Sequence, residues 1–247
     1  MTPFFFGRTE VQLFGAYDAP AGGGRNAVVL CYPFGREYLL AHGTFRLLAR
    51  KLAAAGLHVL RFDYSGTGDS AGEIEDAREA RWPADVSTAI DEVKELAQAE
   101  QVTLVGMRYG AALAARAVRG RADVNRLVLW DAVTDGAGYL ARAGVSPDSG
   151  AGGAACEASG VVLTPALRAD IEGLTLERYG AGLPATLVLT TNGPAYGGIQ
   201  LRERLGSVAV DCRAEHVPDV AVWQVEWGQG GEGMAVSAVQ RIVEWLS

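Results

Sequence analysis

Short apolar runs and longer amphipathic segments alternate along most of this chain. Runs that are apolar almost throughout, rich in β-branched residues and bounded by turn signals are typical of strands covered on both faces of a parallel sheet. The pattern predicts strands at residues 27–32, 58–64, 102–107, 126–133, 186–191, 208–212 and 220–227. A partly alternating segment at 11–17 predicts an edge strand that pairs with residues 4–6.

Segments with apolar positions near a 3.6-residue period predict helices at 41–55, 83–98, 109–119, 166–174, 200–205 and 234–246. The first should bury Phe45, Leu48, Leu52 and Ala55, with Gly56 as its C-cap, and the second Ala84, Ile90, Val93 and Leu96. Repeated strand–helix alternation predicts an α/β fold, with a mainly parallel, doubly wound sheet, right-handed crossovers and helices on both faces.

One stretch breaks this alternation. Residues 144–160 are rich in glycine, alanine and serine and have no apolar period. Because strands resume after it, we interpret this stretch as a mobile lid or cap loop inside a domain and not as a linker between domains. We expect one domain over residues 1–247, with the lid or cap segment at about 134–183.

Composition and charge narrow the function classes. The 247-residue chain has a formal net charge of -7, which argues against nucleic-acid binding by bulk electrostatics. No apolar run is long enough for a membrane span, and the N-terminus lacks the basic and apolar regions of a signal peptide. The three cysteines are widely spaced and form neither a disulfide framework nor a CxxC metal motif. We therefore expect a cytoplasmic protein without a metal ion or cofactor.

The most informative motif is Gly106-Met107-Arg108-Tyr109-Gly110, between a predicted strand and a predicted helix. It has the spacing of the G-x-S-x-G nucleophile elbow, with arginine at the serine position. Arginine stays protonated and cannot act as a nucleophile, and a cation at a helix N-terminus is disfavoured by roughly 0.3–1 kcal/mol. Arg108 should therefore pair with a carboxylate or recognise an anionic ligand group; the candidate carboxylates are Glu37, Asp63, Asp131 and Asp135.

Two further motifs accompany this elbow. Residues 62–70 (FDYSGTGDS) look like the D-x-x-G-x-G-x-S loop of serine-aminopeptidase-like hydrolases, and residues 30–35 (LCYPFG) lie where such enzymes carry an oxyanion turn. With the elbow, they make nearly the whole chain resemble α/β-hydrolases. The resemblance is strongest to bacterial hydrolase-like proteins associated with exosortase systems and secondary-metabolite clusters. It implies an α/β-hydrolase-type sheet with a short lid insertion.

The residues that would complete a serine triad are absent from their expected places. A base histidine should follow the last strand, but residues 228–233 contain none. His42 lies near the presumed oxyanion turn and could face the pocket. His58 opens a strand and suits a satisfied core or edge position, and His216 precedes the last predicted strand. Asn192 follows the strand that usually carries the acid, which leaves Asp131 and Asp135, after an earlier strand, as candidates.

Displaced nucleophiles are the remaining chemical possibility. Cys31 ends a strand near the presumed pocket and could pair with His42, although a buried, small apolar role is the commoner one for such a cysteine. Ser65 and Ser70 lie in the loop at residues 62–70, which we call the glycine-rich loop, and turn or capping roles account for them there.

The function that we favour from the sequence is that of an atypical, cofactor-independent enzyme, which catalyses cyclisation, elimination or rearrangement of a small natural-product or acyl intermediate. The alternatives are an inactive pseudo-hydrolase that binds a ligand or partner protein, and a hydrolase or thioesterase with a displaced nucleophile. We expect a small-molecule or acyl substrate, with a homodimer or a carrier protein as further partners. The candidate catalytic residues are Arg108, Asp131, Asp135 and His42, and the candidate substrate-binding residues are Tyr32, Phe34, Gly35, Tyr64, Met107 and Tyr109.

Overall fold

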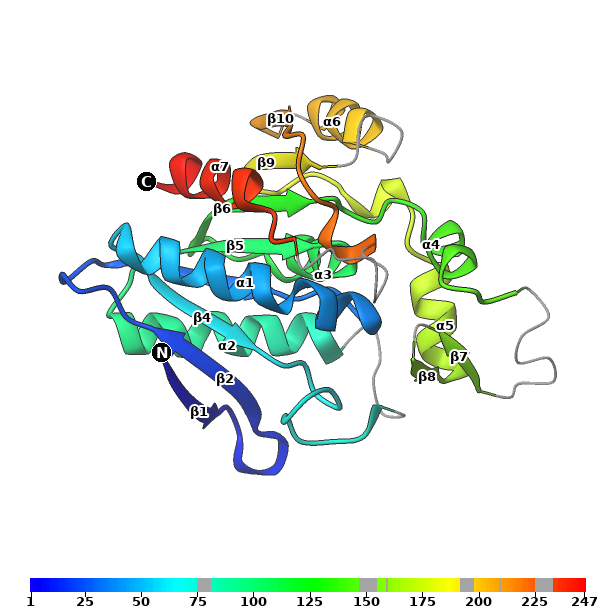
Figure 1. Cartoon of the computed structure of the whole chain (residues 1–247), viewed down its shortest axis with the longest axis horizontal. Coiled ribbons are helices and arrows are strands. Elements are labelled where there is room, and N and C mark those ends of the chain that lie inside the picture. Colours follow the sequence, from blue (N-terminus) through cyan, green and yellow to red (C-terminus); the bar gives the residue numbers. More distant parts are fainter. Residues whose placement is uncertain (75–80, 147–154, 159, 192–197, 209, 225–232) are drawn as a thin grey trace.

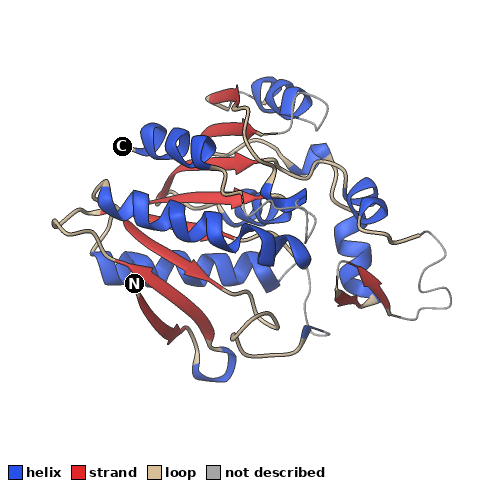
Figure 2. Cartoon of the chain, viewed as in Figure 1, coloured by secondary structure: helices blue, strands red, loops and turns tan. Residues whose placement is uncertain are grey.

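A central sheet of eight strands runs through the computed structural model, which describes residues 1–74, 81–146, 155–158, 160–191, 198–208, 210–224 and 233–247 (Figures 1 and 2). The strand order is β1-β2-β4-β3-β5-β6-β9-β10. The β1–β2 and β2–β4 pairs are antiparallel, and every later pair is parallel. The mainly parallel sheet and the N-terminal edge hairpin are therefore confirmed.

The elements have the following bounds. The sheet contains β1 (Thr2–Phe6), β2 (Leu13–Asp18), β3 (Asn26–Cys31), β4 (His58–Phe62), β5 (Gln101–Met107), β6 (Val124–Trp130), β9 (Ala185–Thr190) and β10 (Cys212–His216). The helices are α1 (Arg36–Ala54), α2 (Arg81–Ala97), α3 (Tyr109–Ala117), α4 (Gly136–Arg142), α5 (Pro165–Glu172), α6 (Gly198–Ser207) and α7 (Val236–Leu246). Short 3-10 turns are η1 (Thr9–Val11), η3 (Leu176–Arg178) and η5 (Val222–Gln224).

Helices cover both faces of the sheet. Helices α1 and α7 pack against each other on one face together with η5, and α2 packs with α3 on the other (Figure 1). The middle of β3, Val28 to Leu30, is fully buried, as its unbroken apolar run predicts. Over the described ranges, no helix combines the length and the apolar character needed to cross a bilayer.

The chain leaves the sheet between β6 and β9. There it forms α4, the antiparallel hairpin of β7 (Cys156–Ala158) and β8 (Val161–Leu163), α5 and η3, which stand to one side of the sheet in Figure 1. The prediction of a loop up to residue 160 is wrong for β7. Its backbone is paired by β8, with Ala158 and Leu163 buried, although the segment has no apolar alternation of its own. Residues 147–154 and 159 lie outside the described part.

The last strand of the sheet differs from the prediction. β10 occupies Cys212–His216, whereas the apolar pattern predicts strands at 208–212 and 220–227. As an edge strand, β10 obtains its backbone hydrogen bonds from β9 alone and carries charged residues, so hydrophobicity does not reveal it. Val222 and Trp223 are apolar and buried because η5 packs on α1, not because they belong to the sheet. Residues 225–227 are not described.

Two helix predictions also need correction. α1 begins at Arg36 and not at residue 41, because Gly35, with φ 62°, turns the chain directly into the helix. Ala55, Ala84 and Leu96, predicted to face inward, are exposed. α2 instead buries a face that begins at Trp82 and includes Asp85, Val86, Ala89, Ile90 and Val93.

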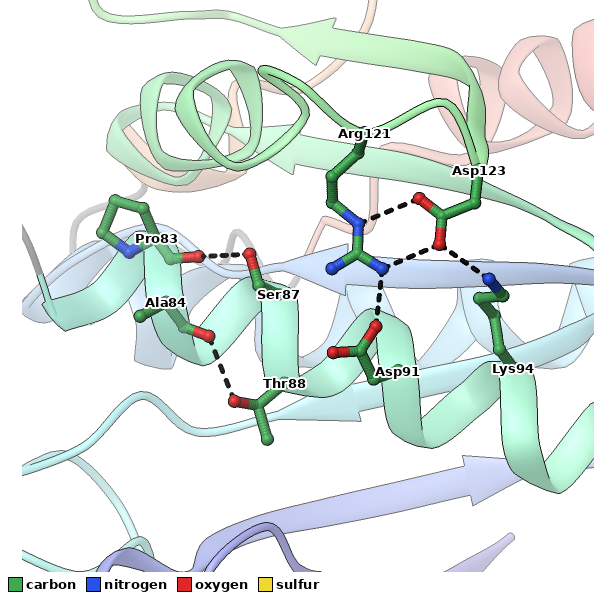
Figure 3. A network of polar contacts seen from close by, with 8 residues as sticks. All are labelled: Pro83, Ala84, Ser87, Thr88, Asp91, Lys94, Arg121 and Asp123. Atoms are coloured by element: carbon green, nitrogen blue, oxygen red, sulfur yellow. Dashed lines mark hydrogen bonds and ion pairs between the residues drawn. The ribbon is translucent and has the colours of Figure 1, made fainter.

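A polar network ties α2 to the segment before β6 (Figure 3). Asp123 accepts hydrogen bonds from Arg121 (Nε–Oδ1 3.0 Å) and from Lys94 of α2 (Nζ–Oδ2 2.7 Å), and Arg121 also contacts Asp91 of α2. Arg121 holds the pKa of Asp123 below its ordinary value. The network lies where β6 begins, at the end of the parallel sheet opposite to the carboxyl ends of its strands.

The turn from β5 into α3 depends on two glycines. A Cβ at Gly106 would lie 2.5 Å from the backbone oxygen of Gly110, and a Cβ at Gly110 would lie 2.2 Å from that of Tyr32. Strand, turn and helix can therefore approach this closely only while both positions lack a side chain. The same close packing brings the N-terminus of α3 against the end of β3.

We expect Gly110→Ala to lower the free energy of unfolding by about 1–3 kcal/mol, the usual cost of overpacking a core. Gly43→Ala is the matched control, because Gly43 lies inside α1 and a Cβ at this position would have no atom within 4 Å. It should stabilise the protein by about 0.5–1 kcal/mol, since alanine favours helix over glycine. Urea denaturation of both variants measures this; a shift of equal sign in the two would contradict the packing argument.

Candidate functional site

Arg108 lies at the carboxyl end of the parallel strands, between β5 and α3, with φ 56° and ψ -124°. A non-glycine residue in this backbone region is strained by about 1–3 kcal/mol. Its guanidinium group is buried: Nε donates to Glu37 Oε1 at 3.2 Å, and Nη1 donates to the backbone oxygen of Asp131 at 3.0 Å. Of the four candidate carboxylates, Glu37 is the one that forms the ion pair.

Aromatic rings complete the surroundings of this ion pair. Arg108 Cζ lies 3.6 Å from the ring centroid of Trp223 and 5.6 Å from that of Tyr139. The Tyr139 hydroxyl donates to Glu37 Oε2 at 3.2 Å. Burial raises the pKa of Glu37 above its ordinary value, against the opposing effect of Arg108. Both the charge and the faces of the guanidinium are therefore occupied by the protein itself.

Asp131 follows β6, where the sequence places a candidate acid. Its carboxylate accepts hydrogen bonds from the backbone N–H of Thr191 (2.9 Å), from the Thr191 hydroxyl, and from the indole N–H of Trp223 (3.1 Å). It contacts Arg108 only through its backbone oxygen. Asp131, Trp223 and Arg108 thus form a continuous series, in which the indole lies between the carboxylate and the guanidinium.

Trp223 is the site residue that the sequence patterns do not reveal. The connection after the last strand begins at Val217, since β10 ends at His216, and Trp223 lies in this connection before α7. A base histidine of a serine triad donates its ring N–H to the acid, and here the indole N–H of Trp223 makes that bond. The predicted strand at 220–227 conceals this, because it moves the expected base loop to 228–233, most of which is not described.

His42 lies away from the Arg108 cluster. Its ring is stacked with that of Tyr32 (6.1 Å between centroids) and tilted relative to that of Tyr38 (6.0 Å). It lines a separate cavity of about 310 Å³ together with Arg46 and Arg61. Burial and these two arginines lower the pKa of His42, so the ring favours the neutral form.

The other two histidines are held by hydrogen bonds at the sheet. His58, in the interior strand β4, contacts the Tyr17 hydroxyl through Nδ1 and the Gly24 backbone oxygen through Nε2 (2.9 Å), which is a satisfied structural position of the kind expected for it. His216 Nδ1 lies 3.1 Å from the backbone oxygen of Thr190. Within the described part, no hydrogen bond or ion pair connects a histidine with Arg108 or Asp131.

The remaining candidate acid has a structural contact. Asp135 is exposed and caps the N-terminus of α4, where it accepts a hydrogen bond from the backbone N–H of Gly138 at 2.9 Å. An N-cap of this kind stabilises a helix without any ligand. The structure therefore brings Arg108 and Asp131 together but places Asp135 and His42 elsewhere.

The three candidate displaced nucleophiles are held in the structure by burial or by hydrogen bonds. Cys31 is fully buried, and burial raises the pKa of its thiol to about 12, so it stays protonated at neutral pH. The Ser65 hydroxyl donates to the buried Asp85. Ser70 bridges two backbone groups, donating to one at 2.6 Å and accepting from the other at 2.9 Å.

A cavity of about 790 Å³ opens at the carboxyl ends of β3 and β4. It lies between the β3–α1 turn, the glycine-rich loop after β4 and the β7–β8 hairpin. Of the candidate substrate-binding residues, Tyr32, Phe34, Gly35 and Tyr64 line it. Met107 and Tyr109 do not; both are buried in the core. Arg108 is not among its lining residues either.

The described residues contain no group of three or more histidine, cysteine, aspartate or glutamate side chains placed to hold a metal ion.

Known proteins are similar to part or nearly all of this chain. A family model described as serine aminopeptidase, S33, matches residues 37–146. No curated protein matches the chain. Among solved structures, a putative hydrolase from Agrobacterium vitis S4 is 20% identical with a TM-score of 0.65, covering 99% of this chain and 96% of that one.

Two further structures are similar over nearly their full length. Est1E from Butyrivibrio proteoclasticus, with ferulic acid bound, is 14% identical with a TM-score of 0.72, covering 98% of this chain and 97% of that one. The mouse α/β hydrolase domain-containing protein 10 is 16% identical with a TM-score of 0.67, covering 100% and 97%. These similarities confirm the α/β-hydrolase fold expected from the three motifs, and at such identities they carry the fold alone.

Removing one partner of the buried ion pair should be far more harmful than removing both. We expect Arg108→Met to lower the free energy of unfolding by about 3–5 kcal/mol, because the Glu37 carboxylate is then buried without a cation. Adding Glu37→Gln should recover part of this loss. A double-mutant cycle from urea unfolding measures the coupling, which should exceed about 1 kcal/mol. Additive effects would show that the two side chains do not depend on each other.

Trp223 should stabilise the site in two separable ways. Trp223→Phe keeps an aromatic ring against Arg108 but removes a hydrogen bond to Asp131, and should cost about 1–2 kcal/mol. Trp223→Ala removes the ring as well and should cost about 3–5 kcal/mol. Trp245→Phe, at a half-buried tryptophan near Arg126, controls for the general effect of the exchange. If Trp223→Phe unfolds like the wild type, the bond to Asp131 contributes nothing.

Proposed function

Given the α/β-hydrolase fold of this chain, we propose that it is a non-hydrolytic protein that binds a small, largely apolar molecule in the cavity beside the former catalytic turn. Among the three functions that the sequence leaves open, this is the ligand-binding pseudo-hydrolase. The observation that carries the proposal is the continuous series of Asp131, Trp223 and Arg108, which lie where a serine triad would have its acid, base and nucleophile. None of the three can act as a nucleophile or take the proton from one.

Each of these residues lacks the chemistry that hydrolysis requires. The guanidinium of Arg108 stays protonated and has no lone pair to offer a carbonyl carbon. The indole of Trp223 is a donor only and cannot act as a general base. Asp131 retains an acid's place, but without a histidine there is no imidazolium for it to stabilise. Losing the nucleophile or the base alone removes nearly all activity from such a site.

An enzyme that uses Arg108 in another way is less well supported. The side chain is 5% exposed and already has a carboxylate, a carbonyl oxygen and two aromatic rings around it. A substrate anion would have to displace Glu37 from a buried ion pair, which would leave that carboxylate without its cation. We therefore assign Arg108 to the structure of the site and not to binding or polarising a substrate.

The cavity is the feature that favours ligand binding over a purely structural role. Its volume of about 790 Å³ lies within the range of roughly 300–1,000 Å³ typical of small-molecule sites. Tyr32, Phe34 and Tyr64 supply aromatic surface, and the backbone around Gly35 supplies polar groups. We propose that the ligand contacts these residues.

We further propose that the segment at about 134–183 acts as a cap on this ligand within a single domain. Val161 and Val162 of β8 line the cavity, and Val162 is 42% exposed at its mouth. A ligand in the cavity would cover this side chain and hold the β7–β8 hairpin closer to the glycine-rich loop.

Two measurements on the purified protein test the proposal. A fluorophosphonate probe should label no residue, and p-nitrophenyl acetate should not be turned over above the buffer rate. The neutral fluorophore N-phenyl-1-naphthylamine should bind, and Val162→Trp should weaken its binding about tenfold by filling the cavity mouth. Val220→Trp is the matched control, since Val220 is similarly exposed (40%) but does not line the cavity.

Stoichiometric labelling of one serine, or catalytic turnover, would overturn the non-hydrolytic assignment. Equal affinity for the fluorophore in the wild type, Val162→Trp and Val220→Trp would overturn the assignment of the binding site.

A further inference from the structure

Asp63 is a buried carboxylate at the wall between two cavities. It follows β4, is 7% exposed, and lines both the cavity of about 790 Å³ and the one of about 310 Å³. Oδ1 accepts a hydrogen bond from the Tyr38 hydroxyl at 2.9 Å, and Oδ2 accepts one from the backbone N–H of Asp69 at 3.1 Å. Burial raises its pKa above the ordinary value.

No cation of the described residues forms an ion pair with this carboxylate, although His42, Arg46 and Arg61 line the smaller cavity that it also borders. Among the described residues, no lysine, arginine or histidine lies within salt-bridge distance of Asp63. Arg61, the neighbouring buried cation, directs Nη2 to Asp18 (3.5 Å) and Nη1 to the Tyr32 hydroxyl (3.4 Å). A desolvated carboxylate without a cation is unfavourable, and a ligand that supplies the missing charge would be favoured at this point.

The carboxylate also has unused acceptor capacity. Two oxygens offer about four acceptor sites, and the hydrogen bonds from Tyr38 and Asp69 use two of them. Gly68 packs so closely that a Cβ there would lie 2.1 Å from Oδ2, so the Gly68 backbone lies against this oxygen and Oδ1 is the less enclosed of the two. Asp63 is one of the lining residues of the larger cavity, so a ligand bound there would lie beside this carboxylate.

The rest of the larger cavity suits an apolar body with a cationic end. The rings of Tyr32, Tyr38 and Tyr64 line it beside Asp63, and aromatic faces attract cations. Among the described residues that line it, the one other charged side chain is Arg36, which is exposed at the N-terminus of α1. Because a charge in water is screened far more than a buried one, Asp63 and not Arg36 should determine which ligand charge is preferred.

We propose that the cavity selects molecules that carry a protonated amine on an apolar body, with Asp63 as the counter-ion of the ammonium group. This inference rests on the proposed function, that the cavity binds a small molecule. It adds the charge of the ligand and the residue that recognises it. The amine would donate to the Asp63 carboxylate, while its apolar part contacts the aromatic and aliphatic wall that extends to Val162.

Three ligands of nearly equal size and different charge test this inference: 4-phenylbutylamine, 4-phenylbutanol and 4-phenylbutyrate. Each competes with N-phenyl-1-naphthylamine for the wild-type protein at pH 7.5. The amine should bind about tenfold more tightly than the alcohol, and the butyrate should bind most weakly. Equal affinities, or a preference for the butyrate, would overturn the proposal without the need for any variant.

Asp63→Asn should reduce the affinity for the amine to that for the alcohol and leave the alcohol unchanged within about twofold. Asp69→Asn is the matched control: it removes a neighbouring carboxylate, but keeps the backbone N–H that Asp63 uses and does not line the larger cavity. It should keep the preference for the amine. A preference for the amine that persists in Asp63→Asn would place the ammonium elsewhere and overturn the assignment.

Circular dichroism establishes that each variant is folded. If Asp63→Asn does not fold, Tyr38→Phe replaces it: losing the hydroxyl frees an acceptor site on Asp63, so amine affinity should rise or stay equal, and a tenfold loss would overturn the proposal. Failure of the proposed function looks different, because then the neutral fluorophore and the alcohol would also fail to bind at the cavity that Val162→Trp fills.

Discussion

Burial of the Arg108 guanidinium is the constraint around which the carboxyl ends of the strands are organised. A buried cation requires a counter-charge and hydrogen-bond acceptors, and here Glu37 of α1 and the backbone of Asp131 after β6 provide them. Tyr139 of α4 and Trp223 of η5 enclose it with their rings. Segments far apart in the sequence are thereby held to one side chain, which explains why α1, α4 and η5 converge at the β5–α3 turn.

The geometry of this turn and the chemistry at its apex are separable. The close approach of β5, α3 and β3 depends on Gly106 and Gly110, which have no room for a Cβ. The positive φ at position 108 follows from the same packing and does not require a particular side chain. A nucleophile elbow can therefore keep its backbone after its serine is gone, provided that the replacement is satisfied locally. Arginine is satisfied here by Glu37, by the backbone oxygen of Asp131 and by the ring of Trp223.

The sequence predicts the parts of this structure that follow from local patterns. Continuous apolar runs identify β3 and β5, and the motif spacing locates the elbow and the cavity wall from Tyr32 to Gly35. Prediction from the sequence fails where contacts between distant segments determine the structure. β10 is a charged edge strand paired only by β9, and without its position the place of Trp223 cannot be found. Glu37 could not be separated from the other three carboxylates, because α1 starts earlier than its apolar period suggests, and the ion pair depends on that extra turn.

The two buried charged side chains Arg108 and Asp63 thus differ in whether an oppositely charged side chain pairs with them. Arg108 is neutralised by Glu37 and covered by rings, so it presents no net charge to a ligand. Asp63 is hydrogen-bonded by Tyr38 and Asp69, forms no ion pair within the described residues, and lines the larger cavity. In a low-dielectric site, an uncompensated charge attracts an opposite one much more strongly than a compensated pair does. Under the proposed function, Asp63 after β4 and not Arg108 at the elbow is therefore the charge that would favour an oppositely charged ligand.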